Sequence, residues 1–192
     1  MADNYLEKKM EEFKAMPGKG VASRSFKGNA TLSKLVEKNI QYKEFNNKII
    51  VRESHLNELA AFAKNYENFE CKICLEQGEI EKIVNSIKNF NPNLLNFNSE
   101  DTLPKAFIIL GKIVNSGIAN ANSGIVNVNS GINSEDFVNS GIILQTILLR
   151  ATEMGLNGTY TVLENNAALA QEMSLDFYPI AAVAIGKGAK AI

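Results

Sequence analysis

The stretch from Asp136 to Gly158 reads DFVNSGIILQTILLRATEMGLNG and predicts a long, mostly apolar helix followed by a tight turn. Apolar residues recur in it at three- and four-residue spacing, which is typical of a helix with one face in the core. Ser134 can cap this helix, and Gly155 is expected to end it in the left-handed conformation that glycine adopts readily. The apolar residues of this helix include Phe137, Ile142, Leu144, Ile147, Leu148 and Ala151.

Helices and strands are predicted to alternate on both sides of this stretch. Apolar runs bounded by turn residues predict strands over Phe69–Leu75, Lys105–Val114, Gly158–Leu163 and Pro179–Ile185. Helical spacing predicts further helices over Thr31–Gln41, from Ser54 onward, over Glu79–Phe90 and over Asn166–Met173. The pattern therefore predicts an α+β fold, with a mixed sheet flanked by helices.

Two segments stand apart from this domain. Residues 1–30 are expected to form a helix over Asp3–Ala15 and then an extended arm, whereas residues 31–192 form the domain itself. Within that domain, residues 114–133 carry Asn-Ser-Gly-Ile repeats at seven-residue spacing. So few short repeats cannot bury a core, and Asn-Ser-Gly favours turns, so we interpret the segment as a surface insertion.

Composition and charge exclude several classes of function. The chain has 192 residues and a formal net charge of −1, which gives no basic footprint for nucleic acid and no general attraction to anionic membranes. Its longest apolar runs fall well short of the roughly 20 residues of a membrane-spanning helix. The first residues are charged and lack the apolar region of a signal peptide, so a cytoplasmic location is expected.

The only two cysteines, Cys71 and Cys74, form a CxxC pair, which invites a redox or zinc interpretation. Both lie in a predicted strand, where residues three apart point to opposite sides. We therefore expect the two thiols to diverge and to serve as structural residues.

Three segments together resemble the nitroreductase family. The first is Asp136–Gly158, with its long apolar helix and Gly-Leu-Asn-Gly turn; the second is Tyr178–Gly188, which is similar to the last core strand of that family with its terminal Ile-Gly. The third, Lys38–Phe45, lies where the family carries the FMN phosphate motif Arg-x-Ser-x-Arg/Lys-x-Phe.

The resemblance implies a particular chemistry and assembly. Members of the family are homodimers with FMN at the subunit interface, so the long helix is expected to contribute to that interface. NADH or NADPH reduces the flavin at N5, and a small acceptor such as a nitroaromatic or a quinone then takes the two electrons. The flavin carries the reaction and the protein supplies binding and orientation, so no catalytic residue is expected.

The resemblance also implies two groups of FMN-binding residues. For the phosphate these are Lys43 at the second basic position of the motif, Gln41 at its serine position, Asn39 near its first arginine, and Lys187 and Lys190 after the last strand. Asn39 carries no charge, so the sequence departs from the family at that position. The residue types alone also allow other interpretations. Lys43 could be a solvated lysine at a helix end, and Lys187 and Lys190 could belong to a basic tail.

For the flavin ring, the resemblance implies Lys64 and Asn65 after the third helix, and the backbone of Tyr160, Thr161 and Val162 near N5. A polar helix end and an ordinary core strand are the alternative interpretations of these residues.

Two other functions remain open on the sequence. The missing phosphate arginine suits a non-catalytic relative that keeps the fold but binds FMN weakly or not at all. The Asn-rich insertion suits an interaction module.

Overall fold

The computed structural model describes residues 36–113, 132–163 and 166–191. A main sheet has the strand order β2-β3-β5-β4, and a second sheet pairs β1 with β6. The strands are β1 (Tyr42–Phe45), β2 (Phe69–Cys74), β3 (Phe107–Lys112), β4 (Asn157–Val162), β5 (Tyr178–Gly186) and β6 (Gly188–Ala191). The helices are α4 (Glu53–Ala60), α5 (Gln77–Phe90), α6 (Ser134–Glu153) and α7 (Asn166–Glu172), with short 3-10 turns η1 (Ala61–Asn65) and η2 (Glu100–Thr102).

Some predicted segments lie outside these described residues. They are the helix over Asp3–Ala15, the arm after it and residues 114–131 of the insertion, so the predicted domain boundaries stay predictions. Of the helix expected over Thr31–Gln41, residues 36–38 are described and are helical, and β1 starts soon afterwards at Tyr42.

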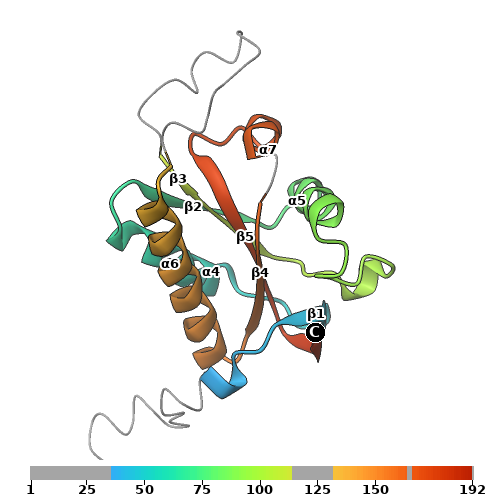
Figure 1. Ribbon diagram of the computed structural model, residues 1–192. Coiled ribbons are helices and arrows are strands. Elements are labelled where there is room, and N and C mark those ends of the chain that lie inside the picture. Colours follow the sequence, from blue (N-terminus) through green and yellow to red (C-terminus); the bar gives the residue numbers. More distant parts are fainter. Residues whose placement is uncertain (1–35, 114–131, 164–165, 192) are drawn as a thin grey trace, which may run out of the picture. The chain divides into compact units, whose positions relative to one another are not determined.

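Helices cover both faces of the main sheet, as Figure 1 shows. One core cluster joins α5 and α7 to one face of the sheet, and a second joins α4, η1 and α6 to the other. The continuously apolar strand β3 serves both clusters: Phe107 and Ile109 belong to the first, Ile108 and Leu110 to the second. A strand whose successive side chains alternate between two covered faces needs apolar residues at every position, which explains its sequence. None of the helices among the described residues is long and apolar enough to cross a membrane.

The expected α+β class and the helix layers are confirmed, but the strand directions differ from the mixed sheet that we predicted. Each of the pairs β2–β3, β3–β5 and β4–β5 is antiparallel. Local patterns indicate where the strands lie but not their directions, which depend on how strands far apart in the chain pair.

The predicted long helix is present as α6, with one correction. Its N-cap is Asn133, whose side chain accepts from the Asp136 amide in a capping box, and not Ser134. Of its apolar residues, Leu144, Ile147, Leu148 and Ala151 are buried, whereas Phe137 and Ile142 are 55% and 46% exposed. Ser140 and Ile143 are also buried.

The end of α6 follows the prediction. Gly155 has a φ of 77°, the left-handed region. Its amide donates to the Thr152 carbonyl, and the Leu156 amide donates to the Ala151 carbonyl. These two bonds form a Schellman motif, and they direct the chain into β4.

A buried ion pair joins the end of β3 to the start of α6. The Lys112 ammonium lies 2.6 Å from both carboxylate oxygens of Asp136. The side chains of Lys112 and Asp136 are only 15% and 8% exposed. The pair therefore holds together the two chain ends from which residues 114–131 depart.

Candidate functional site

The small sheet brings the two ends of the domain together beside the main sheet (Figure 1). Strand β1 pairs antiparallel with β6, with Glu44 opposite Lys190 and Phe45 opposite Gly188. Strand β6 follows β5 after a single residue, so the last core strand positions it. The sequence analysis did not predict either strand, because four residues are too few to show a strand pattern.

Glycines permit this pairing at close range. A Cβ atom on Gly188 would lie 2.2 Å from the Tyr42 ring, and one on Gly186 would lie 2.8 Å from the Phe45 ring. Only glycine leaves room for the two rings at these positions. The last strand thus needs its Gly-x-Gly sequence to receive β1.

Strand β1 is also attached to its neighbours by hydrogen bonds. The Tyr42 amide donates to the Thr159 hydroxyl at 2.8 Å, and that hydroxyl donates to the Tyr42 carbonyl at 2.6 Å. On the other side, the Asn96 amide donates to the Lys43 carbonyl at 2.9 Å. These contacts place Lys43 between β4 and the loop that follows α5.

Lys43 and Lys190, which were both predicted from the sequence, line one cavity of about 420 Å³. This volume lies within the roughly 300–1,000 Å³ of small-molecule sites. A third lysine, Lys88 of α5, also lines it, and sequence reasoning missed this residue. The remaining lining residues are Glu44, Pro92, Asn93, Leu95, Asn96, Phe97 and Asn98.

The lining of this three-lysine cavity is net positive. Three lysines face one carboxylate, that of Glu44, which leaves two net positive charges. The Glu44 carboxylate is 3.7 Å from the Lys190 ammonium and accepts from the Asn96 side-chain amide at 3.2 Å. Among the described residues, Lys43 and Lys88 have no carboxylate within 4.0 Å. The cavity therefore suits a small dianion.

The other residues predicted for the phosphate do not line the cavity. Asn39 and Gln41 directly precede β1 and are half-buried. The Lys187 ammonium donates to the Gly155 carbonyl at 2.9 Å, beyond the end of α6. A cation is favourable there because the carbonyl end of a helix carries partial negative charge.

The residues predicted for the flavin ring lie elsewhere. Lys64 and Asn65 are exposed in η1, just before Phe69, which pairs with Lys112 at one end of the main sheet. The cavity is at the opposite end, where Gly186 leads into β6. The structure therefore does not bring Lys64 and Asn65 together with Lys43.

Tyr160, Thr161 and Val162 lie on β4, the last strand in the order of the main sheet. Thr161 is buried, and its hydroxyl donates to the Val162 carbonyl at 3.1 Å. Val162 is exposed. Within the described residues only β5 pairs with β4, so the other edge of β4 has backbone groups without a partner strand.

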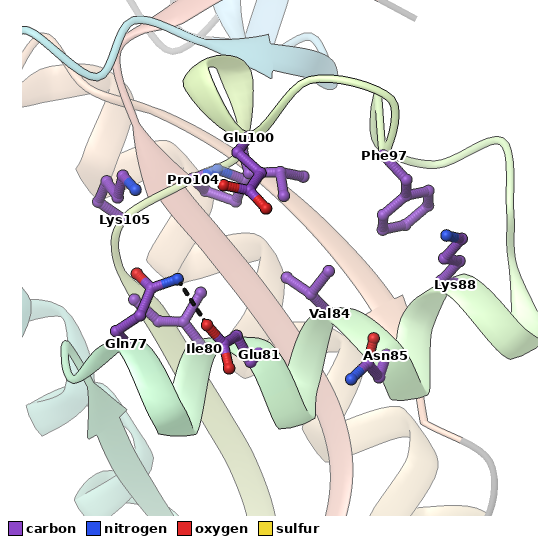
Figure 2. Close-up of a pocket in the computed structure, with 11 residues that line it drawn as sticks. Gln77, Ile80, Glu81, Val84, Asn85, Lys88, Phe97, Glu100, Pro104 and Lys105 are labelled. Atoms are coloured by element: carbon purple, nitrogen blue, oxygen red, sulfur yellow. Dashed lines mark hydrogen bonds between the residues drawn. The ribbon is translucent and has the colours of Figure 1, made fainter.

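A second cavity, of about 310 Å³, adjoins the first. Figure 2 shows it between α5 and residues 97–105, with Lys88 and Phe97 pointing into it from opposite sides. Both of these residues also line the three-lysine cavity. The two cavities therefore share a boundary at Lys88 and Phe97, and the second is also lined by Glu81, Glu100 and Lys105.

The two cysteines diverge, as predicted. Cys74 belongs to the core cluster under α5, whereas Cys71 packs against the cluster on the other face of the sheet. Burial, and next to it the charge of Glu70, raises the pKa of the Cys71 thiol to about 12. Burial and then Glu79 raise the pKa of Cys74 to about 12 as well. Thiols with a raised pKa are protonated near neutral pH, which supports their interpretation as structural residues.

No family model matches this chain, and no curated protein matches its sequence. Solved structures match its fold. A nitroreductase family protein from Clostridium novyi superposes with a TM-score of 0.61 at 16% identity, over 83% of this chain and 86% of that one. An FMN-dependent nitroreductase from Clostridium difficile gives 0.59 at 12% identity, over 82% and 90%. A protein assigned as an NAD(P)H:FMN oxidoreductase, from Staphylococcus epidermidis, gives 0.58 at 15% identity, over 85% and 89%.

These matches confirm that the chain has a nitroreductase-like fold, as the three sequence segments predicted. At identities of 12% to 16% the likeness concerns the fold, because one fold supports many functions.

Proposed function

We propose that this chain is an FMN-dependent NAD(P)H oxidoreductase of nitroreductase type, which reduces small electron-poor acceptors such as nitroaromatics and quinones. The observation that carries the proposal is the meeting of Lys43 and Lys190 in one net-positive cavity. The resemblance to the phosphate motif and to the last core strand predicts both lysines as phosphate ligands from the sequence alone. The phosphate of FMN carries about two negative charges, and the cavity lining has two net positive ones.

The chain would hold FMN at two places. Lys43 and Lys190 would bind its phosphate, with Asn39 and Gln41 beside them. The open edge of β4, at Tyr160, Thr161 and Val162, would offer backbone groups to the ring. Lys64 and Asn65 lie at the end of the sheet away from the cavity, so they would not contact the phosphate. They remain candidates for contact with the flavin ring. When bound, FMN supplies the two-electron chemistry at its N5 atom, between NADH or NADPH and the acceptor.

A homodimer is part of the proposal, and the outer face of α6 supports it. At 3.6 residues per turn, Val138, Ile142, Gln145 and Leu149 share one stripe of the helix. Val138 and Ile142 of this stripe are 61% and 46% exposed, and Leu149 is half-buried. A second copy of α6 would cover these three apolar side chains.

The direct test is reconstitution of the full chain with FMN. We expect a yellow protein that retains flavin through gel filtration and oxidises NADH or NADPH when an acceptor is added. A colourless protein that gains no flavin would exclude the proposal. It would then favour the alternative, a non-catalytic protein of the same fold, which the uncharged Asn39 suits.

Lys43→Ala is expected to weaken FMN binding by about 1.5–3 kcal/mol, the range for a hydrogen bond to a charged group. Fluorescence titration with FMN measures this change. Lys48→Ala is the matched control, because Lys48 lies in the exposed turn after β1 and does not line the cavity. Equal affinities of the Lys43→Ala and wild-type proteins would mean that the phosphate binds elsewhere.

A further inference from the structure

Lys88 reaches the three-lysine cavity from an element that the phosphate motif does not include. It lies in the last turn of α5, directly after Ile87, which is 2% exposed and anchored in the core. Ile80 and Ile83 bury the same face of the helix. The backbone at Lys88 is therefore held firmly, and its long side chain extends from a fixed position towards β1 and β6.

The charges in the cavity leave a role for this third cation. Glu44, the one carboxylate in the lining, is already in contact with Lys190 and Asn96. Without Lys88 the lining would have one net positive charge, whereas a phosphate monoester carries about 1.5–2 negative charges at pH 7. With Lys88 the lining has two net positive charges, which match the charge of the phosphate.

The neighbouring cavity limits how far the anion site extends. Beyond Lys88 and Phe97 the neighbouring cavity has apolar side chains from Ile80, Val84 and Leu103, and it is also lined by Glu81, Glu100 and Lys105 (Figure 2). Apart from the shared Lys88, this lining has one net negative charge, so it does not favour a second phosphate. The net-positive lining is thus confined to the three-lysine cavity, which fits a single terminal phosphate on a larger organic molecule.

We infer that Lys88 is a third cationic ligand of a phosphate monoester that is held between β1, β6 and α5. The three lysines together replace the arginine fork of the phosphate motif with three separate ammonium groups, each with three donors. The identity of the monoester as FMN rests on the proposed function; the anion site itself does not.

A simpler role for Lys88 is to offset the partial negative charge at the end of α5. That role would affect the stability of the helix and would not depend on the ligand. A comparison of FMN with riboflavin separates the two roles, because the molecules differ only in the phosphate.

The experiment titrates the full chain and its variants with FMN and with riboflavin. Lys88→Gln is expected to weaken FMN binding about tenfold and to leave riboflavin binding unchanged, and Lys88→Arg is expected to restore most of the FMN affinity. Lys105→Gln is the matched control, since it removes the same charge from the neighbouring cavity only. Equal FMN affinities for Lys88→Gln and Lys105→Gln, or an equal loss for riboflavin and FMN, would overturn the inference.

Inorganic phosphate distinguishes failure of this inference from failure of the proposed function. If the wild-type chain binds neither flavin, the FMN proposal is wrong, and phosphate is then titrated while the amide NMR signals of Asn93, Asn96 and Asn98 are followed. Suppose that these signals shift and saturate in the wild type, and that the phosphate affinity falls about tenfold in Lys88→Gln. This result would support the anion site, with another monoester as its ligand. The absence of such shifts would overturn it.

Discussion

Asp136→Ala is expected to lower the free energy of unfolding by about 3–5 kcal/mol, because it leaves the Lys112 ammonium buried without a counter-charge. It also removes the acceptor for the Asn133 amide, which is 2.8 Å from the carboxylate in the capping box of α6. The carboxylate thus serves a cation and a helix end at once, and both lose their partner. Urea denaturation followed by circular dichroism measures the loss.

Glu135→Ala is the matched control for this substitution. Glu135 lies in the same first turn of α6 but is exposed, so its loss is expected to cost no more than about 0.5 kcal/mol. If Asp136→Ala lowered the free energy of unfolding by less than about 1 kcal/mol, the Lys112 ammonium would reach water without cost. The ion pair between Lys112 and Asp136 would then contribute little to stability.

The same ion pair predicts an acid dependence of stability. Burial alone would raise the pKa of Asp136, but hydrogen bonds from Lys112 and from the Asn133 backbone outweigh it and lower the pKa below the usual value of 3.8. A carboxyl group with a lowered pKa contributes its full stabilisation above the unfolded-state pKa and loses it as the pH falls through the folded-state pKa. We therefore expect a smaller acid-induced loss of stability below about pH 4 in Asp136→Ala than in the wild type.

Ile142→Glu is expected to convert the proposed homodimer to a monomer. In a two-fold dimer formed through the outer face of α6, the substitution would bury a charge, and symmetry would place its counterpart nearby. We expect the dimer to dissociate at least about 100-fold more readily, equivalent to about 2.8 kcal/mol. Sedimentation velocity over a range of concentrations measures this.

Phe90→Glu controls for the effect of a charge on an exposed apolar helix residue. Phe90 is 42% exposed at the end of α5, on a different part of the fold from α6. It is expected to leave the dimer intact. A wild-type chain that sediments as a monomer, or an Ile142→Glu chain that stays dimeric, would refute the interface on α6.

Local patterns explain which elements could be predicted. Helix α5 repeats isoleucine at helical spacing, and β3 is apolar from Phe107 to Leu110, so each is specified by its own residues. The sequence of α6 does not say which side of the helix meets the sheet, because apolar residues occur on more than one side of it. The burial of Ser140 and Asp136 and the exposure of Phe137 and Ile142 result from the position of α6 on its sheet and from the partner of Asp136 on β3.

Some residues of the candidate site could be predicted from the sequence, whereas their meeting in one cavity could not. Lys43 and Lys190 were identified from flanking motifs, but nothing in the sequence indicates that they share a cavity, since that depends on the pairing of β1 with β6. Lys88 has no local signal at all, because a lysine near the end of a helix is ordinary.

By itself, the stretch from Asp136 to Gly158 determined a long helix, a glycine-terminated turn and a resemblance to one family, because helical spacing and caps are local properties of the chain. Only the tertiary structure decided which face of that helix is buried, that the strands are antiparallel, and that three lysines from β1, α5 and β6 line one cavity. These features depend on contacts between residues far apart in the chain, and the geometry of such contacts is set when the elements pack.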